Sequence, residues 1–192
     1  SGTFNGSVTH ASGYIQGDGS TGYFDFATSP SSIGQTTASG STFMLMKDSG
    51  AAGDKVFLGS RGAALAGEVS LSRFGAINYG IISREPAVPN AQLGVSGSGI
   101  LITNRSGTTN LILARRMASG YVASSVDSTD ASPNTITSQN MYSGGLNNNG
   151  SLAFPSDAQL GFYGIGLSIS DLTAFTLAIK TLWETCTGLS LP

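Results

Sequence analysis

Charged side chains are scarce in this chain of 192 residues. Asp, Glu, Lys and Arg make up 10% of it, against about 25% in a typical globular domain. The nine Lys and Arg residues are scattered, so the sequence shows no basic patch that could neutralise nucleic-acid phosphates. The formal net charge of −2 also argues against a nucleic-acid partner. Ser, Thr, Asn, Gln and Gly must therefore cover much of the surface, as is common in secreted and particle-borne β proteins.

Cysteine and histidine each occur once, as Cys186 and His10. One cysteine excludes an intrachain disulfide, and neither residue type can form a metal-binding cluster. Because Cys186 falls in an apolar helical pattern, we expect it to be a small buried hydrophobe. No apolar run approaches the roughly 18 residues of a membrane-spanning helix, so no membrane insertion is expected.

Catalytic constellations are also missing. Glycoside hydrolysis uses two carboxyl groups about 5–10 Å apart, but Glu68 and Glu85 have no acid two residues away, and Asp25 stands alone between two phenylalanines. His10 lies in a polar segment, where a lone histidine is more often a surface residue than a base. The glycine-rich turns lack the Lys-Ser/Thr pair of a phosphate-binding loop. We therefore predict that the chain is not an enzyme and needs no cofactor.

Short apolar segments separated by Gly-, Ser- and Asn-rich turns dominate the chain. Turn signals recur about every 8–12 residues, which is typical of a sandwich or barrel. The expected strands are residues 13–16, 22–26, 42–46, 56–59, 68–74, 77–82, 99–103, 110–115, 122–123, 135–143 and 160–167. Residues 42–46 are fully apolar and predict a central strand. Residues 68–74 and 77–82 predict a hairpin, as do 99–103 and 110–115 across a turn at 104–108, whereas 85–98 and 127–134 predict loops.

The C-terminal region predicts one amphipathic helix over residues of about 169–187. Ser168 and Asp171 have the spacing of a capping box, and Gly188 supplies a stop. The expected apolar stripe is Leu172, Phe175, Ile179, Leu182 and Cys186. The single tryptophan, Trp183, flanks this stripe; we expect it to pack under the helix, with a contact to another subunit as the alternative.

Several segments resemble concanavalin A-like, LamG-type jelly-roll domains of phage and virus-like proteins. Residues 13–23 resemble the opening signature of that group, and residues 104–111 resemble its Asn-Arg-Thr hairpin. Residues 147–167 are similar to its Asn-Asn-Gly turn and final strand, and 168–187 to its closing helix. The resemblance covers nearly the whole chain. It implies one domain over 1–192, an all-β, two-sheet antiparallel jelly-roll sandwich with one C-terminal α-helix.

Related lectins often hold Ca²⁺ with clustered Asp and Asn. Here Asp127, Asp130 and Asp157 come nearest to a group, but without the spacing of an EF-hand calcium loop. We therefore predict no metal.

The remaining candidates are ligand-binding loops. Sugars are bound by flat aromatic faces and by Asn, Arg or Asp side chains. Tyr142, Asn147, Asn148 and Asn149 meet that description at one loop, and Asn104 with Arg105 at another. The structural alternative is that Asn-rich and Gly-rich stretches simply form turns, because Asn tolerates the left-handed conformation.

The resemblance implies, by analogy, a particle-surface or tail-fibre domain on the virion surface or outside the cell that binds a host glycan or receptor. Its expected partners are that ligand, other virion subunits, or further copies of itself, as a trimer if it tips a fibre. One alternative is a purely structural module that decorates or cements a capsid or tail. Another is a carbohydrate-binding module appended to a hydrolase, whose catalytic residues would lie outside these 192 residues.

Overall fold

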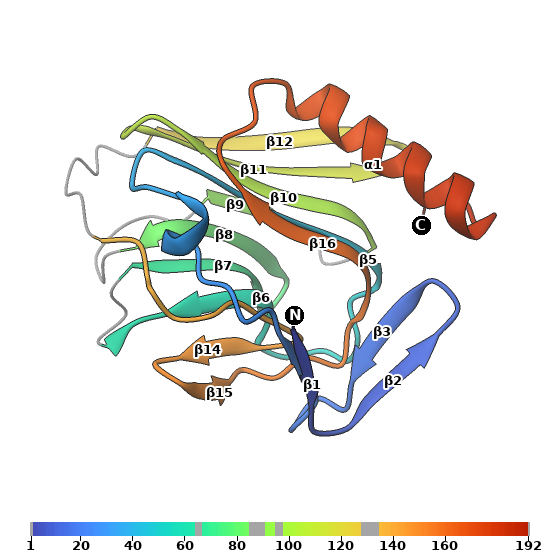
Figure 1. Cartoon of the computed structure of the whole chain (residues 1–192). Helices are drawn as coiled ribbons and strands as arrows, with labels where there is room; N and C mark the ends of the chain where they lie inside the picture. The colour runs from blue at the N-terminus through green and yellow to red at the C-terminus, as the bar shows by residue number, and fades with distance from the viewer. Residues whose placement is uncertain (1, 64–66, 85–90, 95–97, 128–134, 192) are drawn as a thin grey trace.

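Two β-sheets pack face to face, and one helix covers the outer face of the seven-stranded sheet (Figure 1). The computed structural model describes residues 2–63, 67–84, 91–94, 98–127 and 135–191. Neighbouring strands run antiparallel apart from the parallel pair β6–β14. The predicted two-sheet sandwich with a C-terminal helix is confirmed.

The strands of each sheet come from both halves of the chain. Within the described residues, the nine-stranded sheet contains β1 (Thr3–Asn5), β4 (Tyr23–Asp25), β6 (Lys55–Arg61), β7 (Glu68–Phe74), β8 (Ile77–Arg84), β9 (Ala91–Gly94), β13 (Tyr142–Ser143), β14 (Leu146–Asn148) and β15 (Ser151–Ala153). The seven-stranded sheet has the order β12 (Gly120–Asp127), β11 (Asn110–Met117), β10 (Gly99–Ser106), β5 (Ser39–Asp48), β16 (Gln159–Gly166), β3 (Tyr14–Gly17), β2 (Val8–Ala11). A short 3-10 helix, η1 (Ser31–Ile33), and the helix α1 (Leu172–Thr187) complete the fold.

Strand β5 is apolar on both faces because both are buried. Met44 and Met46 point into the core between the sheets, whereas Leu45 packs with Trp183 beneath the helix. Strand β5 pairs with β10 on one side and β16 on the other, which confirms its predicted central position. The two predicted hairpins, β7–β8 and β10–β11, are confirmed as well.

Some boundaries were predicted wrongly. Strand β9 lies inside the predicted 85–98 loop, whose residues 85–90 and 95–97 fall outside the described part, as do 128–134 of the predicted 127–134 loop. Of residues 135–143, Tyr142–Ser143 form a strand. Strand β10 continues to Ser106, so Asn104 and Arg105 lie in the strand rather than in the turn. The extension follows from β5, which pairs with β10 along its whole length.

The helix begins three residues later than predicted and exposes part of its expected stripe. Asp171 is itself the N-cap, accepting a hydrogen bond from Ala174 N at 2.9 Å, so the capping box was wrong. Gly188 ends the helix in the left-handed conformation, as expected. Cys186 is exposed, contrary to prediction, and Leu182 is 47% exposed.

Trp183 is buried where the predicted stripe had placed Leu182 and Cys186. Its side chain is 2% exposed and packs with Leu45, Ile100 and Leu191. Two glycines make room for it: a Cβ on Gly161 would lie 2.7 Å from Trp183 Cζ3, and one on Gly13 2.9 Å from Cη2. The largest side chain of the helix thus sets which helix face meets the sheet.

An ion pair ties the β5–β6 connection to the segment before β16. Lys55 Nζ contacts the Asp157 carboxylate, which also accepts a hydrogen bond from Ala51 N at 3.0 Å. Burial acts to raise the pKa of Asp157, but the Lys55 ammonium and the Ala51 N–H outweigh it, and the net pKa is lowered. Three backbone N–H groups, of Thr21, Ser20 and Gly22, likewise lower the pKa of Asp18.

Acid should therefore destabilise the protein through these two carboxylates. Because their folded-state pKa values lie below the unfolded value of about 3.9, their contribution is present above that pH and is lost as pH falls through the folded values. Asp157→Asn should lower the free energy of unfolding at pH 7 by about 1–3 kcal/mol, since it leaves a buried ammonium without its counter-charge. It should also flatten the decline below pH of about 4. Urea unfolding between pH 7 and pH 2 measures both, and equal pH slopes for the variant and the parent would contradict the assignment.

Candidate functional site

Two of the predicted loop ligands are buried within the nine-stranded sheet. Tyr142 pairs with Asp25 and Gly59, and its ring lies 4.4 Å from that of Tyr23. Burial raises the pKa of Tyr142 to about 12. Asn147 is 3% exposed; its Nδ2 donates to Asn140 O at 2.9 Å. Neither side chain presents a free face to a ligand.

The next two asparagines shape the β14–β15 hairpin. Asn148 Oδ1 accepts a hydrogen bond from Arg61 Nε at 3.0 Å. Asn149 (φ 51°) and Gly150 (φ 94°) connect the paired residues Asn148 and Ser151. Two positive φ angles in a two-residue connection define a type I′ turn, for which Asn-Gly is the preferred sequence. Asn149 is exposed at this turn.

The second predicted pair, Asn104 and Arg105, anchors chain segments to each other. Asn104 Nδ2 donates to Ile169 O at 3.1 Å, and Asn104 Oδ1 accepts from Ile169 N at 2.7 Å. This buried amide therefore fixes the segment that leads into α1. Arg105 Nη1 donates to Thr108 O at 3.1 Å and so holds the β10–β11 turn. The pair belongs to the seven-stranded sheet and the 142–149 segment to the other, so the fold places them in different sheets.

An open groove lies instead where β3 and β16 separate. The two strands pair at Gln16–Gln159 and Ile15–Leu160, and no further paired residues follow toward Gly13. Strand β16 stays paired with β5 on both sides of an irregularity between Leu160 and Tyr163. The C-terminal turns of α1 close the far side of the resulting fork. The groove has a volume of about 510 Å³.

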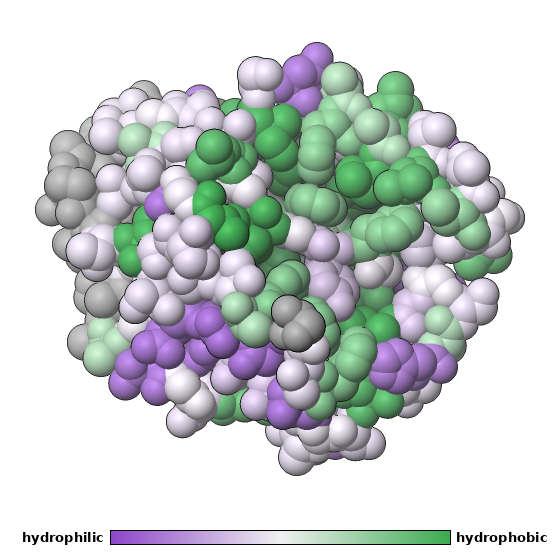
Figure 2. All heavy atoms as spheres, in the orientation of Figure 1, coloured by the Kyte–Doolittle hydropathy of each residue, from purple (hydrophilic) through white to green (hydrophobic). Residues whose placement is uncertain are grey.

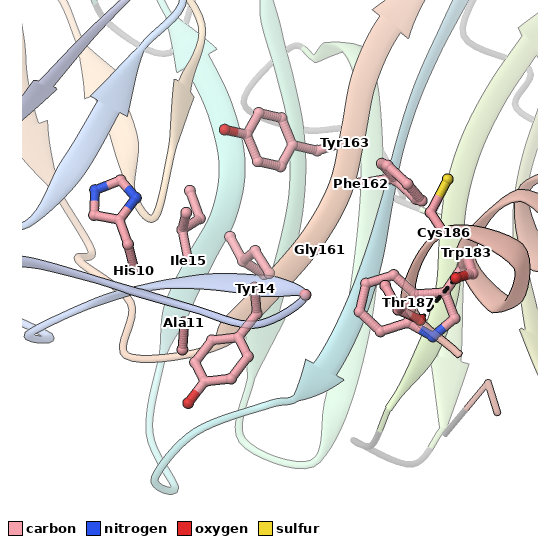
Figure 3. A pocket seen from close by; sticks show the side chains of 12 residues that line it. His10, Ala11, Tyr14, Ile15, Gly161, Phe162, Tyr163, Trp183, Cys186 and Thr187 are labelled. Carbon is pink, nitrogen blue, oxygen red and sulfur yellow. Dashed lines mark hydrogen bonds between the residues drawn. The ribbon is translucent and has the colours of Figure 1, made fainter. Parts of the chain in front are cut away.

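Aromatic and apolar side chains line this groove (Figure 3). The lining consists of His10, Ala11, Gly13, Tyr14, Ile15, Leu160, Gly161, Phe162, Tyr163, Trp183, Cys186 and Thr187. Tyr14 and Phe162 come from the two sides of the fork, and both are half-buried. Figure 2 shows hydrophobic residues gathered over β16 and α1, and hydrophilic ones over β14 and β15.

Few polar groups reach the groove, and each has a structural reason for its position. His10 lies on β2 with its ring edge-on to Phe4 at 4.5 Å. The Lys47 ammonium lies 4.7 Å from the centre of the Tyr14 ring, a distance at which a cation is attracted to an aromatic face. Thr187 Oγ1 donates to Trp183 O at 2.7 Å. The Tyr163 ring packs against Phe26 at 5.2 Å, and burial raises the pKa of its hydroxyl.

Sequence reasoning missed the groove although its signal is visible. Gly13-Tyr14 and Gly161-Phe162-Tyr163-Gly164 are aromatic segments flanked by glycines in two predicted strands. Gly13 and Gly161 make room for Trp183 in α1, which lies at least 22 positions away from either of them in the sequence. Only the tertiary fold makes β3 and β16 neighbours and lets them diverge at Gly13 and Gly161.

No three His, Cys, Asp or Glu residues gather as metal ligands in the part of the chain that the structure describes. Among the same residues, no helix is long and apolar enough to cross a membrane. No protein-family model matches the sequence, and no curated protein matches it either. The likeness to concanavalin A-like phage domains therefore stays a prediction.

Substitutions in the β14–β15 hairpin should change the free energy of unfolding. Asn147→Ala removes the acceptor of Gly150 N and the donor to Asn140 O, and we expect it to cost about 1–3 kcal/mol. Asn149→Ala removes the short polar side chain that makes the left-handed conformation tolerable and should cost about 1–2 kcal/mol, whereas Asn149→Gly should change stability by a few tenths. Chemical denaturation of the three variants tests this, and equal stability of Asn149→Ala and Asn149→Gly would exclude the strained turn.

Proposed function

We propose that this protein is a non-enzymatic glycan-binding domain of a particle surface, such as a phage tail fibre, spike or head decoration, and that the groove between β3, β16 and α1 is its binding site. The observation that carries the proposal is an open groove of about 510 Å³ with aromatic side chains on both walls. Ligand sites of about 300–1,000 Å³ with apolar linings and a few polar groups are typical of small-molecule binding.

The chemistry of the lining suits a sugar. A pyranose ring has apolar C–H faces, which stack on aromatic rings, and hydroxyls, which need hydrogen-bond partners at the edge. Tyr14 and Phe162 offer rings from opposite walls, while the Tyr14 hydroxyl supplies a donor and an acceptor. A ligand lying in the fork could therefore meet both kinds of surface at once.

Regular secondary structure forms the walls, which favours recognition. The β2–β3 hairpin is paired in register over four residues, and Phe162 packs edge-on to Trp183 at 5.9 Å. Pre-formed walls bind with little loss of conformational entropy. The low charge and the abundance of Ser, Asn and Gly suit the surface of a particle or another extracellular position, as the resemblance to phage domains implies.

Binding should depend on the aromatic walls. In a glycan-array screen of the purified domain, Tyr14→Ala and Phe162→Ala should each weaken binding at least about tenfold, equal to about 1.4 kcal/mol. Asn148→Ala, at the hairpin away from the groove, should leave the affinity unchanged. A thermal melt of each variant checks that it is folded. Loss of binding in Asn148→Ala with full binding by Tyr14→Ala would move the site back to the 142–149 loop.

One feature favours a second candidate function, a structural module that packs against another copy of the chain. The outer face of α1 is uncharged and consists of Ala174, Leu177, Ala178, Thr181, Leu182 and Thr185. Leu177 and Leu182 are 49% and 47% exposed, and the Thr181 hydroxyl donates to Leu177 O within the helix. A surface helix normally carries polar residues on this side, and a helix that is apolar all round is normally covered.

A second copy fits this face because two uncharged faces meet without burying an unpaired charge. The helix is about 24 Å long, so the pair alone buries less than the roughly 1,200 Å² of a stable interface. We therefore expect weak self-association, strengthened where a particle holds many copies together.

Sedimentation velocity should show an average mass that rises above the monomer mass of 19.5 kDa as concentration increases. Leu177→Asp combined with Leu182→Asp should abolish this rise, because each buries a carboxylate at the helix pair. Leu167→Asp, at a leucine 55% exposed outside the helix, is the matched control and should not abolish it. A parent protein that stays monomeric at all concentrations would remove the self-association proposal.

A further inference from the structure

The lining of the groove contains no side chain with a formal charge, which limits the ligands that it can bind. Among its twelve lining residues there is no Asp, Glu, Lys or Arg. His10 is the one residue among them whose side chain can become a cation, and its ring packs on Phe4. A carboxylate or sulfate that enters such a lining loses hydration without gaining a counter-charge, which is costly.

Two ammonium groups lie near the groove but outside its lining. The Lys47 ammonium sits over the Tyr14 ring at 4.7 Å and covers one face of it. On the helix side, Lys180 Nζ contacts Glu184 Oε2 at 2.6 Å, so that ammonium is paired one turn from Trp183. Neither ammonium belongs to the twelve residues that line the groove, so neither is part of the surface that a ligand touches.

The helix end adds an electrostatic preference. Trp183, Cys186 and Thr187 belong to the last turns of α1, which ends at Gly188. The C-terminus of a helix carries a partial negative charge of roughly half an electron, from carbonyl groups that lack intrahelical donors. This field repels anions and attracts hydrogen-bond donors such as sugar hydroxyls.

We propose that the groove binds uncharged oligosaccharides and rejects sialylated, uronic or sulfated ones. This inference rests on the proposed function, because it names the chemical class of glycan that the same groove would take. An uncharged lining and a negative helix end act in the same direction. The net charge of −2 on the whole chain adds to the rejection of anions at low salt.

Matched glycan pairs test the inference. Each neutral oligosaccharide is presented beside its sialylated and its sulfated derivative at pH 7.5, and affinities are measured for the parent chain and for Cys186→Lys. For the parent we expect at least tenfold tighter binding of the neutral member, with little change between 0.05 and 0.5 M NaCl, since no ion pair is involved. Cys186 is exposed, so the lysine is tolerated, and it should raise the affinity for the acidic members severalfold.

The outcomes separate the two proposals. Equal or tighter binding of the acidic members by the parent, lost when Tyr14 is replaced by Ala, would overturn the charge preference and leave the glycan-binding groove in place. Binding of no glycan of either class would overturn the proposed function itself, and the charge preference with it.

Discussion

The position of the Trp183 indole is the constraint on which much of this structure depends. It fills the space between the helix and the seven-stranded sheet, against Leu45 and Ile100. It fits because Gly13 and Gly161 have no Cβ at the two points of contact. Since burying a Trp side chain contributes several kcal/mol, its loss would be expected to free the helix from this end of the sheet. The same contact leaves the fork between β3 and β16 bounded by the helix.

At its other end the helix is positioned by polar contacts. The Asn104 amide binds both backbone groups of Ile169, and Asp171 caps the first turn. Arg116 adds a bond from Nε to Thr176 Oγ1 at 2.8 Å. Apolar packing at both ends, together with directional hydrogen bonds at the N-terminal end, fixes the helix direction. The leucines on its outer face are consequently held toward solvent, where they can meet a partner but not the core.

Polar side chains in this protein mostly serve its own backbone. Asn147 and Asn104 each bind backbone groups that would otherwise lie unpaired in a turn or at a strand end, and Asn148 accepts a hydrogen bond from the Arg61 side chain. A chain with few charges must satisfy its many connections in this way, because neutral amides and hydroxyls are the donors and acceptors at hand. Residue types that can bind sugars are thus used as internal braces, and the surface left for a ligand is the aromatic one.

The sequence by itself determined several elements through local periodicity. The alternation in residues 68–74 and the apolar run 42–46 predict strands. The three- and four-residue spacing of 172–179 predicts the helix. It also placed the Asn-Gly turn, whose positive φ angles follow from residue chemistry. Only the tertiary structure decided which face of the helix is buried, since the size of Trp183 and two glycines far from it in sequence settle that choice. It likewise decided that Asn104 is buried and that β3 and β16 diverge. Both depend on which strands become neighbours, and local pattern does not encode contacts between residues 65 or more positions apart.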